Sequence, residues 1–296
     1  MSDLTRPGAL PLRPLTTGEL LDGAVVLLRA RPIQLLGLGL VLALAEQVVL
    51  FPLRSLARQD ISLFPGTGRL QEYGVLVVTG FGTEALIIAI LGGVAAREGG
   101  RALLGRAAPA RPKQRPASLT VISLVAMLVC ALAAAPFLVV LEPLQTGGFI
   151  AAFVLVAILW PIPYGLIGLA APAVVIEQRG PASALLRSLR LASRDSLRAT
   201  WIRVLGYVAW LIVRLGLITA TITLVDLFGS LPTETADRLV LAGTAVLANA
   251  LAYPMLGCLD VMLLLEARMR TEGLDIALRR ALTRGVATDA SLAVNR

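Results

Sequence analysis

The chain has 296 residues, of which 57% are hydrophobic and 16% are charged, and its mean hydropathy is +0.81. Soluble domains carry about 25% charged residues, so this composition indicates a membrane protein. The sequence contains no histidine, which excludes His-ligated metal sites and Ser-His-Asp or Cys-His nucleophiles. The two cysteines, Cys130 and Cys258, lie singly in apolar runs and exclude a CxxC motif, so we expect no metal and no other cofactor.

Residues 17–30 are predicted to form a short amphipathic helix at the membrane interface. Thr16 and Glu19 have the spacing of a capping box, and Pro32 is expected to end the helix just before the chain enters the membrane. The apolar residues that share one helical face are Leu20, Leu21, Ala24, Leu27 and Leu28. Residues 1–16 are predicted to be a cytoplasmic segment, and because they hold no apolar stretch and no cleavage site, we expect no signal peptide.

A spanning helix needs about 20 mostly apolar residues, and the chain contains six such runs. The runs are Ile33–Leu53, Val75–Ala96, Leu119–Leu141, Gly148–Ile176, Val204–Val225 and Leu239–Leu265. They predict an all-α polytopic membrane helix bundle, formed as one domain by residues 17–284 and followed by a flexible tail at 285–296. Only Glu142–Gly147 separates the third run from the fourth, which predicts a short loop there.

Lysine and arginine are distributed unequally between the two sides of these spans. The segments 1–32, 97–118, 177–203 and 266–296 hold 22 of the 27 basic residues, whereas the loops on the other side hold four. Cytoplasmic loops carry the excess of basic residues, so both termini are predicted to be cytoplasmic, in a bacterial plasma membrane. Because the arginines concentrate in loops and follow no nucleic-acid-binding motif, we expect no nucleic-acid partner. The basic loop 97–118 is interpreted as flexible and solvated, with a docking strap for another subunit as the alternative.

The fourth run is 29 residues long and carries two prolines near its middle, Pro161 and Pro163. Each proline removes a backbone donor and pushes its ring against the preceding turn, so we predict a kink or break. One interpretation is a bend that neighbouring helices cover. The other is a discontinuous helix that lines a cavity, as in transporters. Pro254 in the sixth run gives the same signal more weakly.

Residues 181–200 predict a second interfacial helix, which begins after Gly180. Its basic residues recur at intervals of three, four and four positions and form one stripe: Arg187, Arg190, Arg194 and Arg198. At the inner leaflet each arginine would gain on the order of 1 kcal/mol from anionic headgroups. We therefore expect anionic membrane lipids as partners, together with other membrane or cytosolic protein subunits.

Four ionisable residues fall within the predicted spans: Glu46, Glu84, Arg214 and Asp260. Such residues are costly in a membrane and frequently functional. The helical rise places Glu46, Glu84 and Arg214 within roughly 5 Å of one another in depth, and Asp260 nearer the cytoplasmic side. We predict that Arg214 pairs with Glu84, Glu46 or both. The pair is interpreted either as a structural ion pair or as a water-accessible site that binds an anionic headgroup or moves a proton.

Two stretches of the sequence carry a resemblance to a known family. The first is Leu12–Ala24 with Leu27–Arg29, and the second is Ala171–Glu177 with Gly180 and Ala184–Leu191. They resemble an uncharacterised, largely actinobacterial family of six-span membrane proteins, similar to the membrane domain fused to some glycerophosphodiester phosphodiesterases. The resemblance implies the membrane fold and not the reaction, because those enzymes need a soluble barrel with histidines and acidic metal ligands.

The main hypothesis on function is a non-enzymatic inner-membrane subunit or scaffold of an envelope-associated complex, which organises partners or lipids at the cytoplasmic face. The alternative is a transporter or lipid-handling protein with a polar site around Arg214 and a proline-broken fourth helix. An intramembrane enzyme that used Glu84 or Asp260 as acid or base would need a second catalytic group. No pair of adjacent carboxylates in the sequence supplies it.

Overall fold

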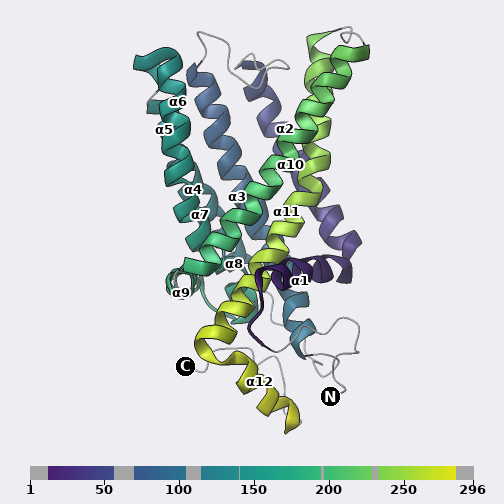
Figure 1. Ribbon diagram of the computed structural model, residues 1–296, viewed down its shortest axis with the longest axis vertical. Coiled ribbons are helices and arrows are strands. Elements are labelled where there is room, and N and C mark those ends of the chain that lie inside the picture. Colours follow the sequence, from purple (N-terminus) through teal and green to yellow (C-terminus); the bar gives the residue numbers. More distant parts are fainter. Residues whose placement is uncertain are drawn as a thin grey trace.

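The computed structural model describes residues 13–56, 70–104, 115–139, 141–194, 197–228 and 233–284. These residues are almost entirely helical and contain no β-strand (Figure 1). The helices, in chain order, are α1 (Thr17–Ala30), α2 (Pro32–Leu56), α3 (Leu70–Leu104), α4 (Pro116–Ala134), α5 (Pro136–Val139), α6 (Leu141–Leu159), α7 (Pro161–Ile167), α8 (Ala170–Ile176), α9 (Pro181–Ser193), α10 (Arg198–Phe228), α11 (Glu234–Glu272) and α12 (Leu274–Thr283).

Six segments of the described chain are long and apolar enough to cross a membrane. They are Pro32–Leu56, Gln71–Leu103, Pro116–Ala134, Ile150–Ile176, Arg198–Leu227 and Thr235–Glu272. Each overlaps one of the six apolar runs of the sequence. The prediction of an all-α, multi-pass membrane protein is therefore confirmed for the described residues.

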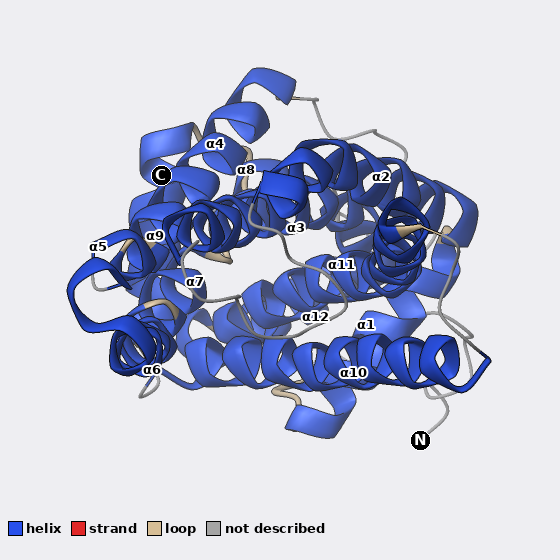
Figure 2. Cartoon of the chain, turned by 90° about the horizontal axis from the view of Figure 1, so that it is seen from above, coloured by secondary structure: helices blue, strands red, loops and turns tan. Residues whose placement is uncertain are grey.

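Helices α3 and α11 form the centre of the bundle. Helix α3 packs against α2, α4 and α8, and α11 packs against α2, α3 and α10. In α3 and in α11, half of the residues in the most apolar 18-residue stretch are buried. In the corresponding stretch of α10, no residue is buried. Figure 2 shows the reason: α10 runs along the edge of the bundle, beside α11.

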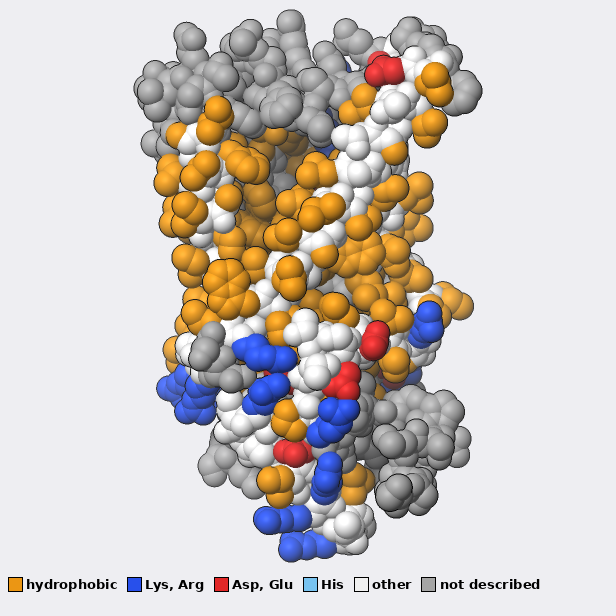
Figure 3. All heavy atoms as spheres, in the orientation of Figure 1, with side chains coloured by type: hydrophobic (Ala, Val, Ile, Leu, Met, Phe, Trp, Pro, Cys, Tyr) orange, Lys and Arg blue, Asp and Glu red, His pale blue; other side chains and the backbone are white. Residues whose placement is uncertain are grey.

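Side chains of different character are separated along the length of the molecule. Hydrophobic side chains cover its middle, and Lys and Arg gather at the end that carries α1, α9 and α12 (Figure 3). We call this the basic end. Such a surface matches a hydrocarbon layer around the middle and water at the basic end.

The third and fourth spans meet differently from the prediction. Helix α4 ends at Ala134 and Pro136 opens the short α5, because a proline lacks the N–H that would continue the helix. The predicted loop Glu142–Gly147 is wrong, since these residues belong to α6, which begins at Leu141. Pro143 falls in the first turn of α6, where N–H groups have no intrahelical partner, so it is compatible with the helix.

The fourth span is interrupted twice. Helix α6 ends at Leu159 and α7 begins at Pro161, since neither Pro161 nor Pro163 donates a backbone hydrogen bond. A second interruption at Gly168, not predicted from the sequence, precedes α8. There Pro172 lacks the N–H that would bond to the Gly168 carbonyl. The residues between the helices keep helical dihedral angles, so the chain bends while continuing across the bundle.

Pro254 does not interrupt the sixth span, because α11 runs from Glu234 to Glu272. Its ring packs against α2 at Gly39, where an added Cβ would lie 2.6 Å from Cγ of Pro254. Gly39 therefore allows the close approach of the two helices. Gly273, whose φ of 64° suits glycine, caps the C-terminus of α11 and precedes α12.

The predicted interfacial helix of residues 181–200 ends early. Helix α9 stops at Ser193, and α10 begins at Arg198. Leu197 has a φ of 61°, a left-handed conformation that an L-residue adopts only as part of a turn. Arg198 therefore belongs to a different helix from Arg187.

The first described helix begins at a complete capping box. The backbone N–H of Thr16 donates to Glu19 Oε2 at 2.9 Å, and the backbone N–H of Glu19 donates to Thr16 Oγ1 at 3.4 Å. The bond from the Thr16 backbone, and then the guanidinium of Arg13, lower the pKa of Glu19.

Three predictions fall wholly or partly outside the described residues. They concern most of the N-terminal segment 1–16, the tail 285–296, and positions 105–114 of the basic loop. Both described ends of that loop are helical, since α3 continues to Leu104 and α4 begins at Pro116.

Candidate intramembrane polar site

Glu46 on α2 lies inside the bundle and accepts hydrogen bonds from three neutral donors. Asn249 Nδ2 and Tyr253 OH, one turn apart on α11, donate to Glu46 at 3.0 and 2.8 Å. Thr83 Oγ1 on α3 donates at 3.0 Å. Only 3% of Glu46 is exposed, and side chains of two helices, α3 and α11, hold its carboxyl group.

Glu84, which directly follows Thr83 on α3, forms an ion pair with Arg214. Its Oε1 contacts Arg214 Nη1 on α10, and its Oε2 accepts from Tyr207 OH at 2.5 Å. Of the two partners expected for Arg214, the structure therefore selects Glu84. Tyr253 links Glu46 to the Arg214–Glu84 pair, because its hydroxyl bonds to Glu46 and its ring centre lies 5.8 Å from Cζ of Arg214. The Glu46–Glu84 network, as we call it, comprises Glu46, Thr83, Glu84, Tyr207, Arg214, Asn249 and Tyr253.

Arg214 is incompletely hydrogen-bonded. Its Nε and Nη2 form the edge of the guanidinium plane that matches the two oxygens of a carboxylate or phosphate. Both atoms are buried, and neither has a hydrogen-bond partner in the described chain. Buried donors in proteins are normally bonded, so this open edge of Arg214 requires an explanation.

The part of α10 that carries Arg214 is weakly packed. The buried residues of α10 lie between Ala199 and Tyr207, and none from Val208 to Leu227 is buried, all of these being described residues. The large exposed apolar side chains of this segment are Val208, Ile212, Val213, Leu215, Leu217, Leu224 and Leu227. Few buried contacts make a segment easier to displace, so Arg214 lies on the less constrained part of its helix.

Asp260 pairs with Arg203, which was predicted to lie in the cytoplasmic segment 177–203. Arg203 Nε and Nη2 donate to Oδ1 and Oδ2 of Asp260 at 2.5 and 3.0 Å, and Nη1 donates to the carbonyl oxygen of Tyr164. Cζ of Arg203 also lies 3.7 Å from the centre of the Tyr164 ring. The side chains of the pair are only 4% and 1% exposed, and each guanidinium nitrogen is bonded.

Two glycines let α10 approach the broken fourth span. An added Cβ at Gly168 would collide with Nε and Cζ of Arg203, and one at Gly165 would collide with the side chain of Thr200. The Gly-x-x-Gly spacing thus serves close helix packing here.

An aromatic cluster separates the two ion pairs. The ring of Trp160 stacks on Tyr164, with centres 4.4 Å apart, and lies 4.5 Å from Tyr207 and 4.8 Å from Phe81. Tyr207 donates to Glu84. These contacts add to apolar burial, and they place the interruption of the fourth span at the centre of the packed interior.

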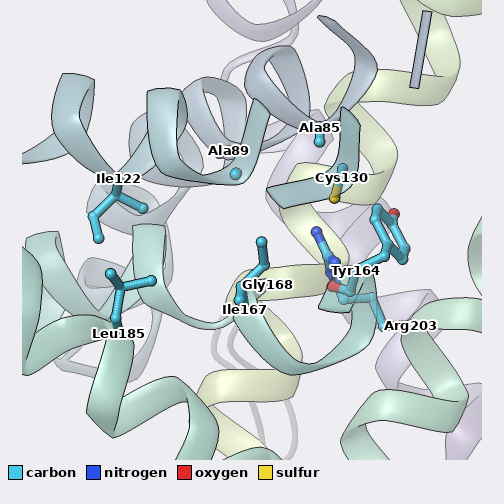
Figure 4. Close-up of a pocket in the computed structure, with 10 residues that line it drawn as sticks. Ala85, Ala89, Ile122, Cys130, Tyr164, Ile167, Gly168, Leu185 and Arg203 are labelled. Carbon is cyan, nitrogen blue, oxygen red and sulfur yellow. Dashed lines mark hydrogen bonds between the residues drawn. The ribbon is translucent and has the colours of Figure 1, made fainter. Parts of the chain in front are cut away.

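A small cavity lies beside Arg203 (Figure 4). Its lining residues are Ala85, Ala89, Ile122, Ala126, Cys130, Tyr164, Ile167, Gly168, Leu185 and Arg203. Cys130, Tyr164 and Arg203 lie together at one side of it (Figure 4). The space admits about one water molecule, so it is too small for an organic substrate. Arg214 is not among its lining residues.

Glu177 lies at the basic end with a fully buried side chain. It contacts Arg179 Nε at 2.6 Å, Arg187 Nε at 3.0 Å and Arg268 Nε at 3.4 Å. Arg187 also pairs with Glu272. Burial lowers the pKa of Arg187, but its bonds to Glu272 and Glu177 more than offset this and raise it. Arg187 is therefore part of the folded interior.

A second cluster at the basic end joins three parts of the chain. Glu266 accepts from Arg198 at 2.5 Å and also pairs with Arg270. The same two arginines donate to the carbonyl oxygen of Leu15, at 3.2 and 3.3 Å. The segment before α1 is thereby attached to α10 and α11.

The four arginines expected to contact lipid headgroups are therefore not equivalent. Arg187 and Arg198 are engaged in ion pairs, whereas Arg190 and Arg194 are exposed. Because α9 ends at Ser193, the prediction that all four arginines form a single stripe on one helix is wrong.

Sequence reasoning missed Arg203 and the tyrosines of the interior. Arg203 lies directly before the predicted run at Val204 and was counted as a loop residue. A signal for it existed, since Asp260 had no partner of matching depth among the residues considered.

The chain was also compared with known proteins. Comparison with protein-family models, with curated proteins and with solved structures finds no match. Within the described ranges no group of three His, Cys, Asp or Glu side chains is placed to hold a metal ion. The polar groups of the interior and of the basic end are therefore the features that bear on function.

Proposed function

We propose that the protein is a non-enzymatic transport or lipid-handling protein that binds the anionic group of an amphipathic molecule at Arg214. One observation carries this proposal: Nε and Nη2 of Arg214 are buried without a partner in the described chain. In Arg203 the same two atoms hold both oxygens of Asp260. The open edge of Arg214 therefore offers a place for a second two-oxygen group.

The chemistry of the ligand follows from the guanidinium. Its planar edge binds carboxylate or phosphate through two parallel hydrogen bonds, which a lysine cannot reproduce. Glu84 does not block this edge, because it contacts Nη1 and has Tyr207 as a second partner. An unbonded guanidinium edge is costly in a membrane interior, so filling it with an anionic group would be favourable.

The surroundings of Arg214 favour an amphipathic ligand. Residues 208–227 of α10 present apolar side chains to the outside of the bundle, which suits an acyl chain. Nε and Nη2 are covered in this conformation, so a ligand reaches them when the weakly packed part of α10 moves. The side chains of Arg214 and Glu84 each keep 11% of their surface exposed, which supports such access.

Lipid retention tests the proposal. The wild type, Arg214→Lys and Arg190→Lys are reconstituted in nanodiscs that contain phosphatidylcholine and phosphatidylglycerol, extracted in mild detergent and examined by native mass spectrometry. Arg214→Lys is expected to retain about tenfold less phosphatidylglycerol, equivalent to 1.4 kcal/mol, since it keeps the charge and loses the two-bond edge. Arg190→Lys controls for surface charge. Equal retention by the wild type and Arg214→Lys would contradict the proposal.

A second proposal is the scaffold or complex subunit, which the exposed part of α9 favours. Arg190 and Arg194 are exposed beside Leu186 and Leu189, which are 54% and 39% exposed. A basic and apolar surface of this kind suits anionic lipid headgroups or the acidic face of a membrane or cytosolic subunit. A stoichiometric protein that co-purifies with the wild type, and not with an Arg190→Glu/Arg194→Glu variant, would support it. Identical co-purification with both proteins would contradict it.

We also propose that the basic end faces the cytoplasm of a bacterial cell, with both termini on that side and α1 and α9 at the interface. The accumulation of Lys and Arg around α1, α9 and α12 supports this orientation (Figure 3). The resemblance to the membrane domain of glycerophosphodiester phosphodiesterases remains a prediction from the two motifs.

A further inference from the structure

We propose that Glu46 is a proton-binding site inside the membrane, which takes up and releases a proton with little change in its surroundings. Two observations carry the proposal independently of any ligand at Arg214. One is the balance of charge in the Glu46–Glu84 network. The other is the set of hydroxyl groups that contact Glu46.

The charges in the network do not balance when both glutamates are ionised. Glu84 is neutralised by direct contact with Arg214. The hydrogen-bond partners of Glu46 in the described chain are neutral: Thr83, Asn249 and Tyr253. An ionised Glu46 therefore leaves one net negative charge within the Glu46–Glu84 network, because the further arginine on α2, Arg54, bonds to Gln47 and not to Glu46. A proton on Glu46 removes that charge.

The hydroxyl of Thr83 can serve either state of Glu46. Thr83 Oγ1 lies 3.0 Å from Glu46 Oε1 and also 3.0 Å from the carbonyl oxygen of Thr79. When Glu46 is ionised, Thr83 donates to it. When Glu46 is protonated, the carboxylic acid donates to Thr83, and Thr83 donates to Thr79.

The opposite oxygen of Glu46 keeps its bonds in both states. Tyr253 OH lies 2.8 Å from Glu46 Oε2, and Asn249 Nδ2 lies 3.0 Å from it. Both groups donate whether or not Oε1 carries a proton. The proton can thus bind without moving heavy atoms, so its uptake and release need little rearrangement of the surrounding side chains.

The other charged and titratable groups around Glu46 lie on its own helix and on three other helices of the bundle. They are Arg54 on α2, Glu84 on α3, Tyr207 and Arg214 on α10 and Tyr253 on α11. Arg54 lies about 12 Å further along α2, where its Nη1 donates to Gln47 Oε1 at 2.5 Å. Gln47 is buried beside Glu46. Arg54 and Gln47 therefore place polar groups between Glu46 and the end of α2 remote from the basic end.

The charge of Glu46 also bears on the anion site. An ionised Glu46 opposes a second anion near Arg214, whereas a protonated Glu46 leaves the Arg214–Glu84 pair electrically neutral. This consequence rests on the proposed function: proton uptake by Glu46 would strengthen anion binding at Arg214. The proton site itself does not depend on it.

Infrared difference spectroscopy of the full chain in nanodiscs, recorded over a series of pH values, tests the proposal. We expect a carboxylic-acid C=O band that disappears with rising pH in the wild type and is missing in Glu46→Gln. Asp22→Asn, which removes an exposed carboxylate, is expected to keep the band. Arg214→Lys should also keep it, so a failure of anion binding does not affect this result.

A second variant keeps the test decisive if Glu46→Gln does not fold. Thr83→Val leaves the carboxyl group in place and removes the bond of Thr83 to either form of Glu46. Because a hydrogen bond to the ionised carboxylate is stronger than one from the neutral acid, the midpoint of the titration should move to higher pH. A band that persists in Glu46→Gln, or a midpoint that Thr83→Val does not move, would overturn the proposal.

Discussion

The two ion pairs inside the bundle use the same chemical groups in different surroundings. In Arg203–Asp260, both carboxylate oxygens occupy one edge of the guanidinium and a carbonyl oxygen binds the remaining nitrogen. In Arg214–Glu84, one nitrogen is bonded and the edge formed by the other two is open. The first pair joins well-packed parts of α10 and α11, whereas the second lies where α10 has no buried residue.

This difference separates a structural pair from a candidate site. A buried ion pair offsets its desolvation cost only when the remaining donors are also bonded. Arg203 meets that condition, and Arg214 does not. We therefore attribute fold stability to Arg203–Asp260 and ligand binding to Arg214–Glu84.

Arg203→Met should have the largest effect on stability. It leaves Asp260 buried without its cation, and removal of one partner of a buried pair costs about 3–5 kcal/mol. Unfolding by sodium dodecyl sulfate in mixed micelles, followed by circular dichroism, measures the loss. A variant as stable as the wild type would show that the pair does not hold α10 to α11.

Arg214→Met should cost less in the same assay, about 1–3 kcal/mol. Glu84 keeps the hydroxyl of Tyr207 as a donor, and part of its side chain is exposed. The ratio of the two losses is the informative quantity. A loss equal to that of Arg203→Met would remove the distinction between the two pairs.

Gly168→Ala should cost about 1–3 kcal/mol through overpacking. The added methyl group would meet Arg203, which cannot move without breaking its bonds to Asp260. Gly216→Ala on α10 is the matched control, since nothing lies within 4 Å of an added Cβ there, and it should be neutral or stabilising by up to about 1 kcal/mol. Equal effects of the two substitutions would contradict the tight packing around Arg203.

Glu19→Gln should have the smallest effect, because Glu19 lies outside both pairs. Its pKa is lowered by the Thr16 backbone and by Arg13, so its charge stabilises α1. That contribution is complete above the ordinary pKa of 4.5 and is lost as the pH falls through the lowered value. The wild type should be slightly more stable than Glu19→Gln at neutral pH, and thermal unfolding curves of the two should converge in acid. A difference independent of pH would contradict this assignment.

The number of spans and the burial of Glu46, Glu84 and Asp260 could be predicted from the sequence, because hydropathy and isolated charges within apolar runs are local signals. It was not sufficient for the turn between the third and fourth spans. An apolar run does not reveal that Pro136 ends one helix and that α6 includes Glu142 and Pro143.

The partners of the intramembrane charges could not be predicted either. Glu46 and Glu84 were predicted to lie at similar depth in the membrane, so depth alone could not show which of them pairs with Arg214. The pairing depends on how α3 and α10 are rotated about their axes, and helix packing sets that rotation. Arg203 was not recognised as an intramembrane residue because it directly precedes the apolar run that begins at Val204. Its burial depends on the glycines of a different span, Gly165 and Gly168.

The guanidinium edge is filled in Arg203 and open in Arg214. The most direct test is NMR of isotope-labelled arginine side chains in nanodiscs, with the two Nε–H signals assigned from Arg203→Lys and Arg214→Lys. We predict that the Nε–H of Arg203 exchanges slowly with water and does not respond when phosphatidylglycerol replaces phosphatidylcholine. The Nε–H of Arg214 should exchange faster and shift with the anionic lipid. Two equally protected signals, both indifferent to the lipid, would contradict the account.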